Sequence, residues 1–257
     1  MVQETESNLI SSQCVDIFLA CHKAIMEGSL IQRISRQDKE FHFQNWFEAR
    51  LKESHIAYDQ KGRNTYPDFT LVQTPEGFEV KGLGWPGRET DYDCNSQVPS
   101  GHHNGRTIYY VFGRYPSAPN EDEYPVIDLV IAHGDFLNSD REYIHKNKSF
   151  KGLGSYGDIK VRDRKMYIAP TPYGLISGVD RQITLILPAN YPSDPRLEAV
   201  GNLSRIEASQ LVIGYSFNMI TNDITPTFEE NPSAGKVHLF IAYRLKNAGG
   251  PQVKLKN

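Results

Sequence analysis

The sequence predicts a single α/β domain in which a mixed central sheet is flanked by helices, with additional strands toward the C-terminal end. The chain has 257 residues, which is enough for one large core. Its 39% apolar and 23% charged residues are typical of a globular protein and exclude a wholly disordered chain. Two helical patterns near the start precede several short β-branched or aromatic runs, which predict the sheet.

Apolar periodicity predicts a first helix over residues 11–28 and a second over residues 37–54. The second helix carries an apolar stripe that includes Phe43, Trp46, Phe47 and Leu51. Glu48 lies at the edge of that stripe and Glu40 nearer its centre. An acid on a packed helix can reach over a sheet edge into a site, although most helix glutamates are simply solvated.

Residues 66–82 predict two short strands joined by a tight turn at Pro75 and Gly77. Pairing of Thr74 with Gly77 would place Asp68 opposite Leu83. Because side chains alternate along a strand, one face is expected to be apolar, with Phe69, Leu71, Phe78 and Val80. The other face would carry Asp68, Glu79 and Lys81. A slip of one residue would scatter this charged trio.

The rest of the chain predicts mostly strands. Residues 82–105 are expected to form a glycine-rich irregular loop, and a short helix is expected near Arg141. Residues 197–213 predict another helix, and residues 221–235 a polar connection. Strands are expected at 55–59, 107–112, 126–132, 158–161, 166–169, 181–187 and 236–245.

Several functional classes find no support in the sequence. The start of the chain lacks a basic leader and no apolar run has membrane-spanning length, so we expect a cytoplasmic protein without a membrane partner. Cys14, Cys21 and Cys94 contain no CxxC pair, which argues against disulfides and a zinc knuckle. Nucleophile-elbow, P-loop and HExxH motifs are absent.

Two weaker motifs are also discounted. GxGxxG patterns at 82–87 and 152–157 do not open a helix, so no nucleotide cofactor is expected. His102 and His103 suggest a metal site only superficially, because adjacent histidines project in different directions and no further ligand is spaced nearby. A turn making polar contacts with DNA or a partner is the favoured interpretation of residues 101–106.

Charge is distributed unevenly along the chain. The net charge of -3 does not indicate a nucleic-acid binder, but residues 141–165 and 236–257 are basic. These segments could form a positive groove beside an acidic site, and a solvated surface explains them equally well.

The charged trio can support metal-dependent hydrolysis. The carboxylates of Asp68 and Glu79, with the carbonyl of Val80, are hard oxygen ligands of the kind that Mg²⁺ prefers. Such an ion can bind a scissile phosphate and activate a water molecule. Lys81 could orient that water or neutralise developing charge. An exposed Glu–Lys pair on a solvated strand is the competing interpretation.

Pro67-Asp68, ten intervening residues and then Glu79-Val80-Lys81 resemble the PD-(D/E)xK nuclease superfamily, whose best-known members are type II restriction endonucleases. The segment around Glu48 resembles that family's helix glutamate, and the resemblance covers about residues 43–84. It implies a restriction-endonuclease-like fold in which Asp68 and Glu79 ligate Mg²⁺, Lys81 serves the nucleophile and Glu48 assists. Glu40 remains the rival helix acid.

The resemblance therefore implies a sequence-specific endonuclease that cuts double-stranded DNA with Mg²⁺ and acts as a homodimer on a palindromic site. Residues 1–257 would form one nuclease domain with a catalytic core over about 36–135. Segments 82–106 and 136–257 would add DNA-binding and dimerisation elements. Arg88 and Arg106 are candidates for guanine or phosphate contacts and Asn95 and Gln97 for adenine; further DNA-binding candidates are His103, Asn104, Arg162 and Arg164.

Three alternatives remain open. A repair or junction-resolving nuclease would recognise DNA shape rather than sequence. A non-catalytic DNA- or protein-binding module could retain the nuclease fold without the activity. The hairpin could also be ordinary surface in an unrelated globular protein.

Overall fold

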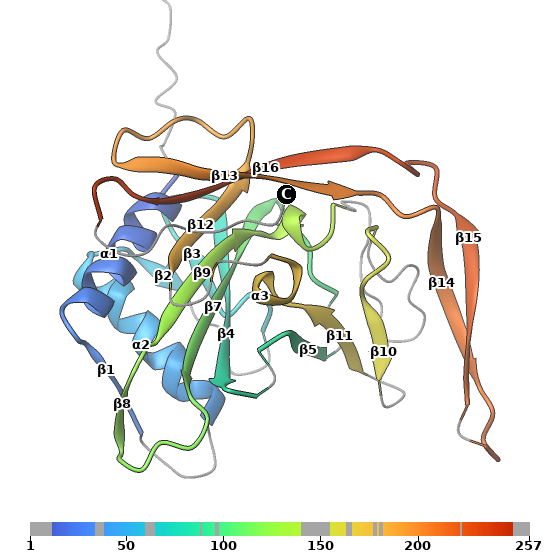
Figure 1. Cartoon of the computed structure of the whole chain (residues 1–257), viewed down its shortest axis with the longest axis horizontal. Coiled ribbons are helices and arrows are strands. Elements are labelled where there is room, and N and C mark those ends of the chain that lie inside the picture. Colours follow the sequence, from blue (N-terminus) through green and yellow to red (C-terminus); the bar gives the residue numbers. More distant parts are fainter. Residues whose placement is uncertain are drawn as a thin grey trace, which may run out of the picture.

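A mixed sheet of nine strands runs through the centre of the molecule (Figure 1). The computed structural model describes residues 12–33, 39–59, 65–87, 89–95, 98–139, 155–162, 166–176, 179, 182–221 and 223–248. The sheet has the order β13-β16-β12-β9-β7-β4-β3-β2, with β6 beside β7. Pairs β4–β7 and β9–β12 are parallel and the other pairs are antiparallel. The predicted mixed central sheet is confirmed.

The strands of this sheet are β2 (Tyr58–Asp59), β3 (Phe69–Leu71), β4 (Glu76–Trp85), β6 (His102–His103), β7 (Arg106–Pro116), β9 (Asp128–His133), β12 (Ile183–Pro188), β13 (Leu197–Ile206) and β16 (Val237–Leu245).

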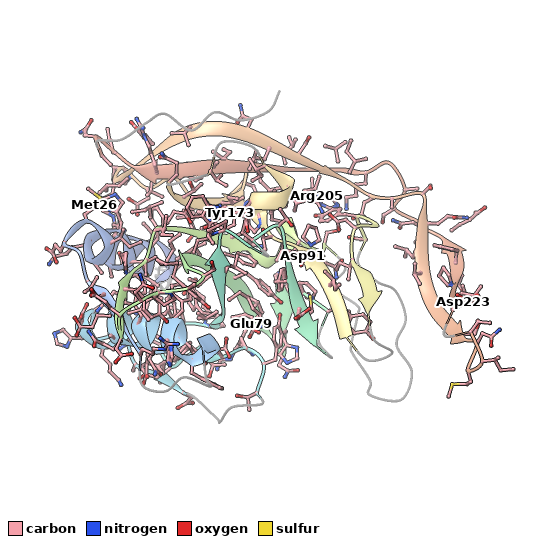
Figure 2. The ribbon with its side chains drawn as sticks, turned by 60° about the horizontal axis from the view of Figure 1, so that its bottom comes forward. Met26, Glu79, Asp91, Tyr173, Arg205 and Asp223 are labelled. Atoms are coloured by element: carbon pink, nitrogen blue, oxygen red, sulfur yellow. The ribbon has the colours of Figure 1, made fainter. Side chains whose placement is uncertain are left out.

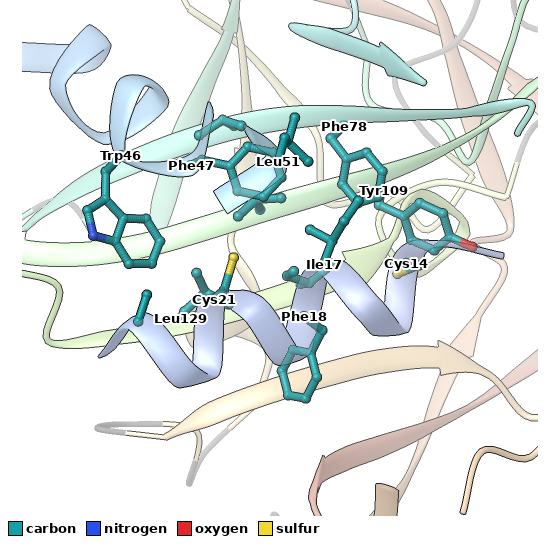
Figure 3. Close-up of a cluster of buried hydrophobic side chains, with 14 of the residues drawn as sticks. Cys14, Ile17, Phe18, Cys21, Trp46, Phe47, Leu51, Phe78, Tyr109 and Leu129 are labelled. Carbon is teal, nitrogen blue, oxygen red and sulfur yellow. The ribbon is translucent and has the colours of Figure 1, made fainter. Parts of the chain in front are cut away.

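Helices α1 (Cys14–Met26) and α2 (Lys39–Glu53) cover one face of the sheet, where the two predicted helices are confirmed. Their buried side chains meet apolar residues of the strands in a first core cluster (Figure 3). The α2 stripe is buried as expected, and Phe47 lies 5.6 Å from Phe69 and 5.8 Å from Phe78 between ring centroids. The apolar side of the predicted hairpin therefore faces α2.

Strand β4 continues through Gly82 and Gly84, for which the sequence predicted an irregular loop. Gly82 pairs with Gly113 of β7, and Phe43 of α2 packs on this pair. A Cβ atom at Gly113 would lie 2.0 Å from Phe43 Cζ, and one at Gly82 would lie 3.0 Å from Phe43 Cβ. The glycines serve close helix–sheet packing, so the irregular loop predicted over 82–105 is wrong at its start, and β5 (Asp91–Asn95) and β6 interrupt it again.

The other face of the sheet is covered mainly by a small three-stranded sheet of order β10-β11-β5. It comprises β5 (Asp91–Asn95), β10 (Lys160–Arg162) and β11 (Met166–Pro170), and the short helix α3 (Pro172–Leu175) follows β11. Residues of this layer join the central strands in a second core cluster. The expectation of flanking helices thus describes the first face better than the second.

Strands make up most of the described C-terminal third, as predicted in general but not in detail. The helix predicted over 197–213 is wrong, because this stretch forms β13 and the start of β14 (Gln210–Phe217). The predicted polar connection contains β15 (Ile224–Glu230), which pairs with β14. The β14–β15 hairpin, called here the arm, projects from the body (Figures 1 and 2). Asp223 lies near the far end of the arm (Figure 2).

Three remaining elements complete the described chain. Strands β1 (Leu30–Gln32) and β8 (Glu123–Pro125) pair with each other, and the 3-10 helix η1 (Gly134–Phe136) follows β9. The helix predicted near Arg141 lies outside the described residues. Within the described ranges, none of the helices combines the length and the apolar character needed to cross a bilayer.

Candidate functional site

The β3–β4 hairpin forms with the predicted faces but with a different register. Gly77 pairs with Thr70 rather than Thr74, a shift of four residues. Because four is an even number, each side chain keeps its predicted face. Phe69 pairs with Phe78, and the next position along the strands therefore places Asp68 opposite Glu79 instead of Leu83.

The wider turn has a structural cause in Glu76. Its carboxylate accepts hydrogen bonds from the Thr74 hydroxyl at 2.8 Å and the Gln13 backbone N–H at 2.9 Å. The Ser12 hydroxyl also donates to it. A carboxylate at the first turn of α1 is favourable because the N-terminal backbone N–H groups lack partners within the helix. Glu76 is therefore held by α1 and cannot form the tight turn that the sequence predicted.

Asp68, Glu79 and Lys81, called here the trio, lie together at one end of this hairpin. The Val80 N–H donates to Asp68 Oδ2 at 2.7 Å, and the Asp68 N–H donates to Glu79 Oε2 at 3.2 Å. Lys81 Nζ lies 2.8 Å from Glu79 Oε1, and the two side chains are only 13% and 11% exposed. Each acid is thus fixed by the other strand, and the interpretation as a solvated surface pair is wrong.

Tyrosines form much of the environment of the trio. Glu79 pairs with Tyr110 across β4 and β7, and the Tyr110 hydroxyl lies 2.7 Å from that of Tyr66. Burial raises the pKa of Tyr66, and the negative charge of Glu79 raises it further. The same two effects act on Tyr92 and Tyr110, whose pKa values are also raised. These phenols stay protonated and can donate hydrogen bonds beside the acids.

Cys94 of β5 completes this side of the site. Burial raises the pKa of its thiol to about 12, although nearby Lys81 acts in the opposite direction. A neutral thiol is a poor nucleophile and a poor metal ligand. Cys94 therefore contributes packing, and oxygen atoms remain the candidate ligands.

The oxygen donors of the trio fit a hard divalent ion. In a β-strand the N–H and C=O of one residue point to the same edge, so the Val80 carbonyl faces the edge at which Asp68 accepts the Val80 N–H. Two carboxylates and one carbonyl are the donor chemistry that suits Mg²⁺. Asp68, Glu79 and Val80 are thus the residues that would hold such an ion.

Glu48 is not brought into contact with the trio in the described interactions. It accepts a hydrogen bond from the Tyr58 hydroxyl and pairs with Lys52 Nζ at 2.8 Å. Burial would raise the pKa of Glu48, but the hydrogen bonds from Lys52 and Tyr58 outweigh it and lower this pKa. These contacts explain Glu48 as a link between α2 and β2. The side chain of Glu40 lies outside the described residues.

The side chain of Arg106 binds the turn between β3 and β4. Its Nη1 donates to the carbonyls of Leu71 at 2.9 Å, Thr74 at 3.3 Å and Glu76 at 3.4 Å. A guanidinium group that satisfies backbone carbonyls in this way stabilises an irregular turn. The structure thus gives Arg106 a role that needs no DNA.

His103 and Asn104 lie near the trio at a tight turn between β6 and β7. His103 pairs with Arg106, and the two turn residues Asn104 and Gly105 have φ angles of 48° and 75°. Asn-Gly is a strong signal for this turn type. The His103 ring lies 4.9 Å from the Tyr66 ring, and burial lowers the His103 pKa. The predicted turn over 101–106 is confirmed.

Two further DNA-binding candidates lie at one end of the small sheet. Asn95 pairs with Tyr167, and Arg162 pairs with Met166, the residue that precedes Tyr167. Cys94 is close enough to Glu79 and Lys81 for both charges to act on it, so this end adjoins the trio. The side chains of Asn95 and Arg162, and the residues Arg88, Gln97 and Arg164, lie outside what the structure describes.

One cluster of chemically active side chains was not predicted from the sequence. His102 lies close to His133 and Asp135, and one ligand atom from each lies within 4.8 Å of the others. The two adjacent histidines do project in different directions, as expected. The expectation that no further ligand lies near His102 is wrong, because the sheet brings in residues about thirty positions away. No short-range sequence signal could have shown this.

No protein-family model, curated protein or solved structure matches the chain. Its function is therefore inferred from the chemistry of the site.

Proposed function

We propose that this protein is a Mg²⁺-dependent endonuclease that hydrolyses phosphodiester bonds in double-stranded DNA, with Asp68, Glu79 and Lys81 as the catalytic residues. The observation that carries this proposal is the register of β3 and β4, which sets Asp68 opposite Glu79 and pairs Glu79 with Lys81 at 2.8 Å. An arbitrary PD…ExK pattern in a sequence would not by itself bring the three side chains together.

The order of elements supports the proposal as well. A helix (α2) precedes three antiparallel strands (β2, β3, β4), and the next strand of the sheet, β7, runs parallel to β4. The trio lies at the β3–β4 hairpin, where the resemblance to PD-(D/E)xK nucleases leads us to expect it. We infer a restriction-endonuclease-like core, enlarged by the small sheet and the C-terminal strands.

Each residue of the trio has a distinct task in this reaction. Asp68 and Glu79 present oxygen atoms to the ion, which when bound neutralises phosphate charge and acidifies water. Lys81, held at Glu79, orients the attacking water and offsets the charge that develops on the phosphoryl oxygens. The water gives up one proton to solvent as its oxygen forms a bond to phosphorus and the P–O3′ bond breaks, and the departing oxygen takes a proton from solvent. The raised pKa values of Tyr66 and Tyr110 keep their hydroxyls available as donors beside Glu79.

The test is incubation of the purified protein with a sequenced plasmid and Mg²⁺, followed by mapping of the fragment ends. Discrete ends at one short palindrome are expected for a restriction enzyme, which would act as a homodimer. Cutting of branched or damaged DNA without sequence preference would instead support a repair or junction-resolving nuclease.

Two lysine variants make the experiment specific to the trio. Lys81→Ala should lower the cleavage rate by about 100-fold or more while DNA binding persists. Lys52→Ala is the matched control, because Lys52 forms an ion pair of the same 2.8 Å length with Glu48. Folding of both variants is checked by circular dichroism. Equal cleavage by Lys81→Ala and wild type would overturn the assignment.

A second candidate is a non-catalytic module in which the trio is a structural clamp. The observation in its favour is that both acids already accept hydrogen bonds from backbone N–H groups within the hairpin. A clamp predicts that Lys81→Ala and Asp68→Asn lower the unfolding free energy while wild type shows no Mg²⁺-dependent cleavage. Cleavage by wild type that Asp68→Asn abolishes without unfolding would exclude the clamp.

A further inference from the structure

His102, His133 and Asp135 form a compact group of nitrogen and oxygen donors in the described part of the chain. His102 Nε2 lies 3.7 Å from Asp135 Oδ1, and His133 Nδ1 lies 3.8 Å from Asp135 Oδ2. The two imidazole rings are 5.9 Å apart between centroids. His102 Nε2 is shielded from solvent, and no described residue forms a hydrogen bond with it. A buried imidazole nitrogen without such a bond is costly unless something else binds it.

The main chain around this group is closely packed, and this sets the positions from which the three side chains project. A Cβ atom at Gly101 would lie 2.0 Å from Asp135 Oδ1, and one at Gly134 would lie 2.3 Å from the Ser100 carbonyl oxygen. Only glycine permits these approaches. The Asp135 N–H also donates to His133 Nδ1 at 3.1 Å, which fixes the ring of His133. The carboxylate is therefore held between two histidines by the main chain.

We propose that His102, His133 and Asp135 bind a transition-metal ion of the zinc class. Tetrahedral zinc with bonds of about 2.0–2.1 Å separates its ligand atoms by about 3.3 Å. The three ligand atoms lie within 4.8 Å of one another, with 3.7 Å from His102 Nε2 to Asp135 Oδ1 and 3.8 Å from His133 Nδ1 to Asp135 Oδ2. A bound ion would therefore draw the side chains together by up to about 1.5 Å. Binding at His133 Nδ1 replaces the hydrogen bond from Asp135. Two imidazoles and one carboxylate favour zinc-like ions over Mg²⁺, which prefers oxygen ligands.

This site is separate from the trio because Glu79 and His133 lie on opposite faces of the central sheet. His133 pairs with Tyr109, whereas Glu79 pairs with Tyr110, the next residue of β7. On β6, His102 likewise points to the face that carries His133, whereas His103 contacts Tyr66 beside the trio. A metal at His102 would hold the short strand β6 against β9 and η1. It would thereby fix the turn that presents His103 and Asn104.

The test uses untagged protein that has been treated with EDTA and freed of the chelator. Zn²⁺ is titrated against a chromophoric competitor, and Co²⁺ is added separately so that its visible absorption reports the coordination. One equivalent is expected to bind per chain. His102→Ala and the isosteric Asp135→Asn should weaken binding about tenfold or more. The matched control is His103→Ala, which removes a neighbouring histidine on the opposite face and should bind as wild type does.

Thermal unfolding supplies a second measurement. Zn²⁺ should raise the Tm of wild type and His103→Ala, and should leave that of Asp135→Asn unchanged. Millimolar Mg²⁺ should not displace the ion. Failure of wild type to retain zinc or cobalt, or equal loss of binding in His103→Ala and Asp135→Asn, would overturn the proposal. Both measurements are made without DNA, so their outcome does not depend on whether the protein is a nuclease.

Discussion

Gly113→Ala is expected to destabilise the protein, because Phe43 packs directly on Gly82 and Gly113. The added Cβ would meet Phe43 Cζ at 2.0 Å and Cε2 at 2.2 Å, whereas ordinary contacts begin at 3.4 Å. The ring must therefore move by more than 1 Å, although it is fully buried and stacked on Trp46 at 5.7 Å between centroids. Overpacking of this kind should lower the free energy of unfolding by about 3 kcal/mol, which is the upper part of the usual range for such substitutions. For a chain of this size that lowers Tm by about 6–12 °C.

The assay is urea and thermal unfolding followed by circular dichroism. Gly84→Ala is the matched control, because a Cβ there would lie 3.3 Å from Ser117 Cα and Cβ, and it should cost less than about 1 kcal/mol. Combining Gly113→Ala with Phe43→Leu should destabilise by less than the sum of the single variants, since the shorter side chain makes room for the new methyl. Unchanged stability of Gly113→Ala, or strictly additive effects, would refute the packing argument.

Glu48 and Arg106 have structural roles that experiments can distinguish from a role in catalysis or DNA binding. Lys52 and Tyr58 lower the pKa of Glu48 below its ordinary 4.5, so the stability gained from the ionised carboxylate is present above about pH 4.5 and lost as pH falls through the lowered value. Glu48→Gln should therefore lower the unfolding free energy at pH 7 by less than about 1 kcal/mol, and urea titrations should show this effect shrinking as the pH falls below 4.5. A 100-fold loss of cleavage would instead place Glu48 in the site. Arg106→Ala should cost about 1.5–3 kcal/mol by the same titration because the turn carbonyls lose a charged donor, and weaker DNA binding at unchanged stability would contradict this.

The sequence predicted which side chains share a face of the β3–β4 hairpin, but it did not predict the register of the two strands. Alternation placed Asp68, Glu79 and Lys81 on one face, because side-chain direction depends only on a period of two. Register depends on what the turn residues bind. Glu76 binds the start of α1, more than sixty residues away in sequence, and a local turn rule does not include such a partner.

The erroneous helix over 197–213 has a comparable explanation. Leu197, Val200 and Leu203 recur every three residues, which imitates helical spacing. In the structure a register shift between Ala199 and Gly201 changes the phase of β13, so that Leu197 joins the first core cluster while Val200 and Leu203 pack against the second. An irregular strand can therefore carry the periodicity of a helix.

The candidate DNA contacts have the weakest sequence signal and stay a prediction. Surface arginines have no periodic signature, and Arg106 turned out to bind carbonyls of the neighbouring turn. The cluster of His102, His133 and Asp135 was not predicted for a different reason. Its members lie on strands that are adjacent only after the sheet has formed, so their proximity is a property of topology.

The arm has a consequence for local unfolding. Strands β14 and β15 pair only with each other among the described residues, and Met219, Ile220 and Phe228 on it are exposed. With little buried apolar surface of its own, the arm can open while the nine-stranded sheet stays intact. Its amide hydrogens should then exchange with solvent many times for each opening of β4 or β7. The hairpin that carries the trio would remain in place throughout, because its protection is that of the whole domain.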